Sequence, residues 1–165
     1  EIAVEIDPMV TTEGQLRLLA EHGFNRLSMG VQDLDERVQQ AIGRGQTMEG
    51  TARVVDLARA LGFQGINLDL IYGLPEQTRP SWARTVERIL DLGPDRLAIY
   101  SFAHLPDRQP HQRKLDAAAM PRGREKLRLF LAARDRLIEA GWTPIGLDHF
   151  ARPGDELALA RRDGP

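Results

Sequence analysis

The feature that most constrains the fold is an alternation of strand-like and helical segments that recurs roughly every thirty residues. Such an alternation is typical of parallel strands joined by helical crossovers. A complete eight-stranded barrel needs about 250 residues, so 165 residues predict only part of a barrel. We therefore expect an α/β fold, a parallel β/α partial TIM-type barrel, with a doubly wound sheet as the rival topology. Strands are expected at 1–7, 25–31, 66–71, 96–102 and 144–147, and helices at 12–22, 35–42, 47–61, 80–92 and 124–140.

The central strand and the turn after it, residues 65–78, carry the clearest functional signal. Asn67 and Asp69 interrupt an otherwise apolar run, and a carboxylate in such a run is costly unless it is paired or binds a ligand. The run breaks at Gly73 and Pro75, and Thr78 can cap the following helix. Both candidate topologies place ligands at the carboxyl ends of parallel strands, so this turn is expected to border the site.

Composition narrows the classes of function. A net charge of -2 gives no reason to expect nucleic acid as a partner, and no apolar run is long enough to span a membrane. The chain has no cysteine, which excludes disulfides, thiolate nucleophiles and cysteine-ligated metal within these residues. It begins at Glu1 rather than at a methionine, which suggests a piece of a longer protein. We expect a monomer in the cytoplasm.

Polar side chains collect where the expected strands end. Carboxylates and amides suit hydroxyl groups or an ammonium, and arginine binds a carboxylate through two hydrogen bonds. His104 and His149 lack the spacing of a metal site, and no nucleophile with an adjacent base is visible, so no catalytic or metal-binding residue is assigned. From chemistry alone Arg44 reads as a solvated surface charge. The set is Glu5, Asp7, Ser28, Gln32, Asp33, Asn67, Asp69, Tyr72, Ser101, His104, Asp148 and His149, and it predicts a small polar ligand at a barrel mouth.

Several motifs resemble the radical S-adenosylmethionine (radical SAM) group that includes oxygen-independent coproporphyrinogen III oxidase and its heme-chaperone relatives. The resemblance implies a partial barrel over 1–150, with the later strands and an extra C-terminal strand, and the start of a C-terminal segment over 151–165. The segments 103–106, 112–114 and 146–153 are similar to the oxidase branch. The motifs that carry the family likeness are EIDP at 5–8, GFNRLSMGVQD at 23–33, NLDLIYGLPEQT at 67–78 and PDRL at 94–97.

The resemblance also implies the site and the reaction. Glu5, Gln32, Arg44 and Asp69 match side-chain contacts to SAM, and Ala103 matches a backbone contact, which reverses the interpretation of Arg44. A [4Fe-4S] cluster would be held by cysteines upstream of Glu1. The implied reaction is oxidative decarboxylation of coproporphyrinogen III to protoporphyrinogen IX in heme biosynthesis, with a reductant protein or flavin system as electron donor, and the chain alone would be inactive. The alternatives are a heme-transferring chaperone and a non-radical barrel enzyme or inactive fragment.

Overall fold

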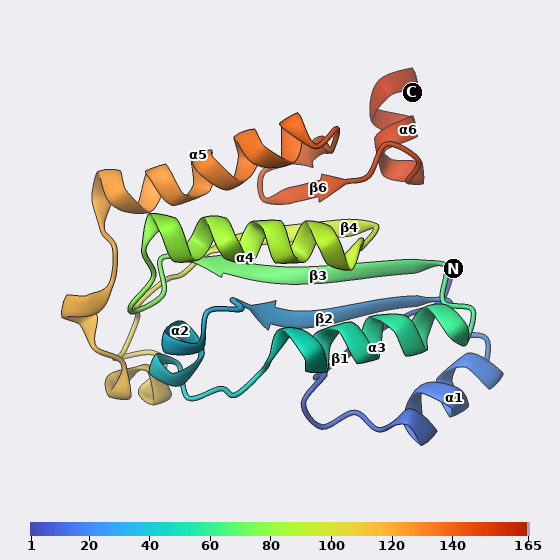
Figure 1. The fold of residues 1–165 in the computed structure, drawn as a ribbon, viewed down its shortest axis with the longest axis horizontal. Coiled ribbons are helices and arrows are strands. Elements are labelled where there is room, and N and C mark those ends of the chain that lie inside the picture. The colour runs from blue at the N-terminus through green and yellow to red at the C-terminus, as the bar shows by residue number, and fades with distance from the viewer. Residues whose placement is uncertain (165) are drawn as a thin grey trace.

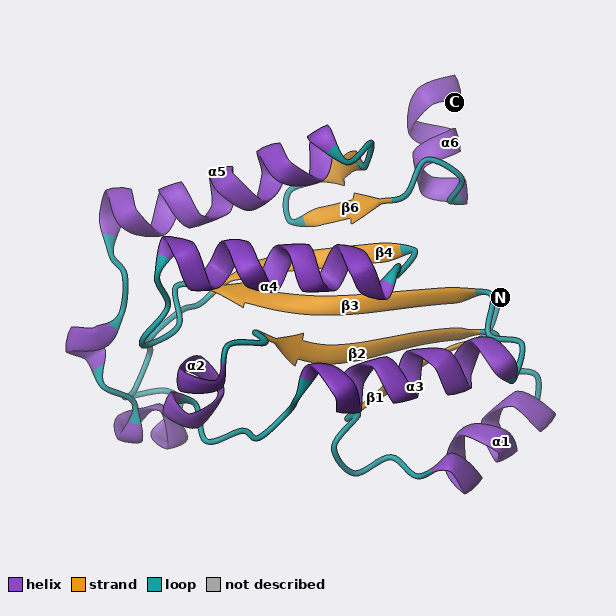
Figure 2. Ribbon diagram, viewed as in Figure 1, coloured by secondary structure: helices purple, strands orange, loops and turns teal. Residues whose placement is uncertain are grey.

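The computed structural model describes residues 1–164 and shows a six-stranded sheet with helices on one side (Figures 1 and 2). The elements, in chain order, are β1 (Ala3–Ile6), α1 (Glu13–Glu21), β2 (Arg26–Gln32), α2 (Glu36–Ala41), α3 (Met48–Ala60), β3 (Gly65–Tyr72), α4 (Arg79–Leu92), β4 (Arg96–Ser101), the 3-10 turns η1 (Pro110–Lys114) and η2 (Ala117–Ala119), α5 (Gly123–Glu139), β5 (Thr143–Gly146), β6 (His149–Ala151) and α6 (Glu156–Asp163).

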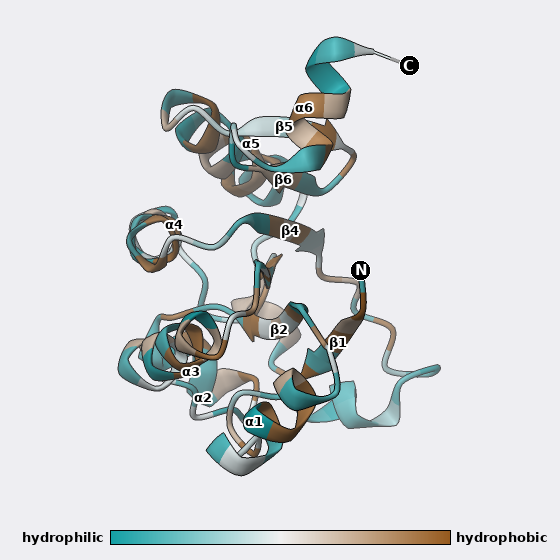
Figure 3. Cartoon of the chain, turned by 90° about the vertical axis from the view of Figure 1, so that its right-hand side faces the viewer, coloured by the Kyte–Doolittle hydropathy of each residue, from teal (hydrophilic) through white to brown (hydrophobic). Residues whose placement is uncertain are grey.

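The sheet is parallel across its first four strands, as the alternation predicts. The strand order is β1-β2-β3-β4-β6-β5, and β1 to β4 are parallel neighbours in chain order. Viewed along the strands, the sheet follows an arc that does not close, with α1 to α5 outside it (Figure 3). The predicted partial barrel is therefore confirmed.

The last part of the sheet differs from the prediction of one strand at 144–147. The chain instead forms a hairpin in which β5 and β6 are antiparallel, and β6 pairs antiparallel with β4. Leu147 lies at the hairpin tip with a φ of 44° and is 95% exposed. Because no glycine-rich turn signal marks this tip, the sequence reads as a single strand.

The core lies between the sheet and its helices, and strand alternation explains its composition. In β2 every second side chain, Leu27, Met29 and Val31, is buried against the helices. Helices α3 and α4 contribute Val54, Val55, Ala58, Trp82, Val86 and Ile89 to the same core. Thr12, Thr47 and Thr78 are the N-caps of α1, α3 and α4, and the cap at Thr78 confirms the prediction for that helix.

The apolar spacing within 124–140 predicts an inward stripe of Leu127, Phe130, Leu131, Arg134, Leu137 and Ile138, but only Leu137 of these is fully buried. The residues that α5 buries are Leu129, Ala133 and Leu137, whereas Leu127 and Ile138 are 54% and 46% exposed. Apolar residues occur on nearly every side of this helix, so their spacing alone does not select the buried face.

An ion-pair cluster lies at the amino ends of β2 and β4. Arg96 Nε lies 3.1 and 3.0 Å from the two carboxylate oxygens of Asp155, and its Nη2 lies 2.8 Å from Glu156 Oε1. Arg26 Nη2 contacts the same Glu156 oxygen at 2.5 Å. Asp155 also caps α6 through the Leu157 amide, so this short helix is fastened to the base of the sheet. None of the helices described is long and apolar enough to cross a membrane.

Candidate functional site

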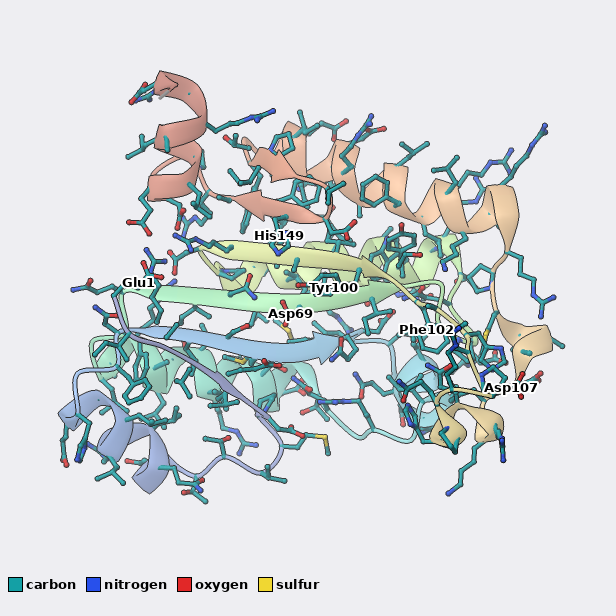
Figure 4. The ribbon with its side chains drawn as sticks, turned by 180° about the vertical axis from the view of Figure 1, so that it is seen from behind. Glu1, Asp69, Tyr100, Phe102, Asp107 and His149 are labelled. Atoms are coloured by element: carbon teal, nitrogen blue, oxygen red, sulfur yellow. The ribbon has the colours of Figure 1, made fainter. Side chains whose placement is uncertain are left out.

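The concave face of the sheet, opposite the helices, is polar. We use the term concave face for the side-chain positions of Glu5, Ser28, Gly30, Asn67, Asp69, Tyr100 and His149, which alternate with the buried core positions or follow them in register. Figure 4 views this face and labels Asp69, Tyr100 and His149 on three adjacent strands.

A hydrogen-bonded row crosses the first three strands of the concave face. Glu5 is the register partner of Ser28, and Ser28 is the register partner of Asn67. The Asn67 amide donates to Ser28 Oγ at 2.9 Å and to Asp69 Oδ1 at 2.7 Å. Asn67 therefore orients the Asp69 carboxylate, and no hydrogen bond to the other oxygen, Oδ2, is found within residues 1–164.

Asp69 is the carboxylate whose ionisation this face perturbs most clearly. Burial raises its pKa, the Asn67 hydrogen bond opposes that shift, and the negative charge of Glu5 adds to it. Tyr100 next to it is 39% exposed, and burial followed by the charges of Asp69, Asp148 and Glu5 raises its pKa. The Tyr100 and His149 rings meet edge to face, with centroids 5.9 Å apart. Acidic side chains and aromatic rings therefore lie together on this part of the concave face.

Gln32 and Arg44 meet at Gly30, at the carboxyl end of β2. A bulge after Gly30 gives Gln32 a φ of 68°, and the side chain turns back over the concave side of Gly30, where a Cβ would lie 2.5 Å from Gln32 Nε2. Arg44 Nη2 donates to the Gly30 carbonyl at 3.1 Å and lies 3.6 Å from Asp7 Oδ1. Because Gly30 is the register partner of Asp69, these side chains border the same end of the concave face.

Two buried polar atoms at this point have no hydrogen-bond partner in the part of the chain that the structure describes. They are Gln32 Oε1 and Arg44 Nε, an acceptor and a donor. A buried polar atom without a partner costs about 1–3 kcal/mol, so these two atoms favour a bound polar group, either water or a ligand. This pair suits a ligand that carries both hydroxyl and carboxylate groups.

Ala103 follows the end of β4, in the segment between β4 and α5 that contains η1 and η2. Its carbonyl accepts a hydrogen bond from Gln112 Nε2 at 3.1 Å, and the Gln112 carbonyl side-chain oxygen accepts the Leu105 amide at 2.6 Å. Gln112 is 8% exposed, so a buried side chain fixes the shape of this loop.

Asp33 and Tyr72, two of the predicted site residues, have structural contacts instead. Asp33 is fully buried and accepts hydrogen bonds from the Leu34 and Asp35 amides, from Thr85 Oγ1 at 2.5 Å and from Gln77 Nε2 at 2.6 Å. Gln77 in turn accepts the Gly73 amide at 2.6 Å. This network joins the loops that follow β2 and β3. Tyr72 packs on Phe130, with ring centroids 5.5 Å apart.

Of the residues matched to SAM contacts, Glu5 and Asp69 share the concave face, Gln32 and Arg44 border it at Gly30, and Ala103 follows the neighbouring β4. Sequence reasoning missed Tyr100, although its alternation with buried Leu97 and Ile99 marks it as a concave-face residue. Residues 1–164 contain no group of three or more His, Asp or Glu side chains able to hold a metal ion.

Known proteins share the sequence pattern and the fold of this chain. The chain is 48% identical over 164 residues to the oxygen-independent coproporphyrinogen III oxidase of Pseudomonas aeruginosa and 49% identical over 160 residues to that of Bradyrhizobium diazoefficiens. These alignments cover 99% and 97% of the chain but 36% of each relative, so the chain spans about a third of their length. The solved coproporphyrinogen III oxidase of Escherichia coli, described as a radical SAM enzyme, superposes with a TM-score of 0.95 at 45% identity, over 99% of this chain and 38% of that one.

The family profile of the radical SAM superfamily matches residues 1–89, more than half of the chain and the part that contains β1, β2, β3 and the Gly30 junction. The matched region therefore includes Glu5, Gln32, Arg44 and Asp69. On this profile, the open parallel sheet and the close structural match, the chain belongs to the radical SAM superfamily.

Proposed function

We propose that this chain forms part of an oxygen-independent coproporphyrinogen III oxidase, which decarboxylates coproporphyrinogen III oxidatively to protoporphyrinogen IX. The observation that carries the proposal is the 48% identity to a relative of that name over 99% of the chain. The other functions weighed from the sequence share the barrel, so the fold by itself does not separate them.

The residues of the concave face fit SAM as a ligand. Arg44 has an unused Nε for the methionine carboxylate, and Gln32 has an unused Oε1 for a ribose hydroxyl. Asp69 offers its Oδ2 to a second hydroxyl, and Glu5 suits the ammonium group. The backbone of Ala103 completes the proposed set.

SAM and a reduced [4Fe-4S] cluster, when bound, supply the one-electron chemistry that removes a hydrogen atom from the substrate. The chain has no cysteine, so the cluster ligands would come from other parts of a protein of the relatives' length. The residues described here bind and orient the cofactor, and the helix-covered side of the sheet excludes water from behind it. The substrate coproporphyrinogen III and a reductant protein or flavin system are the proposed partners.

We further propose that residues 1–150 belong to the barrel and that 151–165 begins a C-terminal segment, with residue 165 outside the described residues. The hairpin strand β6 crosses this boundary by one residue, at Ala151. The full-length protein is expected to be a monomer in the cytoplasm. Size-exclusion chromatography with light scattering tests the oligomeric state.

The test of function is product analysis of the full-length, anaerobically reconstituted protein supplied with SAM, reductant, coproporphyrinogen III and a one-electron acceptor for the electron that each decarboxylation releases. Formation of protoporphyrinogen IX with consumption of SAM is expected. Heme binding without this product would reject the oxidase in favour of a chaperone. The segments 103–106 and 146–153, which resemble the oxidase branch, favour the first outcome. The isolated chain is expected to be inactive.

A further inference from the structure

A cavity of about 340 Å³ lies outside the concave face, at the carboxyl ends of β3 and β4 and the start of α5. It is lined by apolar and basic side chains, and no carboxylate lines it. The lining residues used below are Gly73, Phe102, His104, Met120, Arg122 and Lys126. We call this cavity the rim pocket.

Lys126 is the central cation of the rim pocket. Its Nζ donates to the Phe102 carbonyl at 2.5 Å and lies 5.8 Å from the centre of the Tyr72 ring. No carboxylate lies within ion-pair distance of Lys126 among residues 1–164, and burial lowers the pKa of its amine. A partly buried ammonium with one hydrogen bond retains two donors and an uncompensated charge.

The backbone conformation of Gly73 makes room for the aliphatic part of the Lys126 side chain. Gly73 has a φ of 91°, and a Cβ there would collide with the Lys126 side chain. The glycine therefore lets the aliphatic stem cross the loop after β3, with the ammonium held at the Phe102 carbonyl.

The other basic residues of the rim pocket also lack carboxylate partners within the described chain. His104 stacks on Phe102, with centroids 6.3 Å apart and an angle of 29° between the rings. Arg122 is exposed and donates to the Ala117 carbonyl at 2.9 Å. With Met120 beside them, these groups form a site with an apolar wall and a cationic end, which suits a carboxylate on a short aliphatic stem.

We propose that the rim pocket binds a propionate carboxylate of the porphyrinogen substrate, an inference that rests on the proposed function. Coproporphyrinogen III carries four propionates, and those that are not reacting need a cationic partner, which the acidic groups Glu5, Asp69 and Asp148 near the cofactor do not offer. The rim pocket is the neighbouring cationic site, and Ala103, the proposed backbone contact to SAM, lies between Phe102 and His104 in the chain. A propionate held there keeps one edge of the macrocycle next to the cofactor.

The test uses the full-length reconstituted protein and the variants Lys126→Gln, Lys126→Arg, Arg122→Gln and Lys114→Gln. Lys114 is an exposed lysine on η1, so its variant makes the same charge change outside the pocket. Binding of fluorescent coproporphyrin III is compared with binding of its tetramethyl ester, and the KM for coproporphyrinogen III and the affinity for SAM are measured in parallel.

Lys126→Gln is expected to weaken acid binding and raise KM about tenfold or more, as expected for the loss of a charged hydrogen bond. Binding of the ester and of SAM is expected to stay unchanged. Lys126→Arg is expected to retain most of the preference for the acid, Arg122→Gln to reduce it less than Lys126→Gln, and Lys114→Gln to match the wild type.

An unchanged acid-to-ester ratio in Lys126→Gln, or a loss of SAM affinity in place of substrate affinity, would overturn the inference. If Lys126→Gln does not fold, an Arg122→Gln protein with the wild-type ratio overturns it instead. A wild-type protein that forms no protoporphyrinogen IX rejects the proposed function and the inference together. A productive wild type with an unchanged ratio in the variants rejects the inference alone.

Discussion

Substituting Asp69 with alanine tests the concave face as the cofactor site. The variant removes a carboxylate whose Oδ1 is held by Asn67 at 2.7 Å and whose Oδ2 has no hydrogen bond within the described chain. Asn67 retains its bond to Ser28, so the fold around it is expected to persist. The change therefore removes the proposed ligand contact with little loss of structure.

The expected loss is that of one hydrogen bond to a charged group. Such a bond contributes about 1.5–3 kcal/mol, which corresponds to a roughly 10- to 150-fold rise in the Kd for SAM. Isothermal titration of anaerobic full-length protein with SAM measures this change. Asp56→Ala on the exposed side of α3 is the matched control, and its affinity is expected to equal that of the wild type.

The pH dependence of the same titration gives a second test. Burial and the charge of Glu5 raise the pKa of Asp69, so the carboxylate is lost, and SAM binding weakens, at a higher pH than for an ordinary aspartate. Glu5→Gln removes one of the two raising effects and is expected to move this transition to lower pH. An unchanged Kd in Asp69→Ala, or a transition that does not move in Glu5→Gln, would refute the assignment of Asp69 to the site.

Three further variants test the surroundings of the site. Asp33→Ala leaves several buried donors unpaired and is expected to lower the free energy of unfolding by about 3–5 kcal/mol. Urea denaturation measures this change, and a loss below about 1 kcal/mol would contradict the structural role of Asp33. Gly30→Ala places a methyl group against Gln32 and is expected to weaken SAM binding severalfold with little effect on stability, because the end of the Gln32 side chain can move. Asp155→Ala removes the α6 cap and the partner of Arg96, and is expected to lower the free energy of unfolding by about 2 kcal/mol. Amide hydrogen exchange in 156–163 is expected to become faster. Protection equal to that of the wild type would count against the ion-pair cluster.

The sequence predicts most of the fold because its local signals agree with one another. Threonine caps, glycine stops and two-residue alternation place the four parallel strands and their helices within a few residues of the observed bounds. The hairpin at Leu147 was missed because its turn uses a non-glycine residue at positive φ. The buried face of α5 was misplaced because both Leu127 and Leu129 belong to plausible apolar stripes, and only contact with α4 decides between them.

The site was only partly accessible from the sequence. Asp69 stands out because a carboxylate interrupts an apolar run, but Asp33 gives a similar signal and is a structural residue bound by Gln77 and Thr85. Arg44 reads as a surface charge until its loop is folded back against Gly30, which no periodicity reveals. The resemblance supplied Arg44, whereas Tyr100 was overlooked although its alternation with Leu97 and Ile99 marks its face.

The buried Asp33 carboxylate affects how much free energy is lost in ordering the chain when a ligand binds. Through Gln77 it connects the turn after β3 to the turn after β2, so each turn restrains the other. A ligand that arrives there loses little free energy to ordering the chain, and more of its contact energy appears as affinity. Loss of the hydrogen bond between Gln77 and Asp33 is therefore expected to slow productive ligand binding, even when every residue that contacts the ligand is intact.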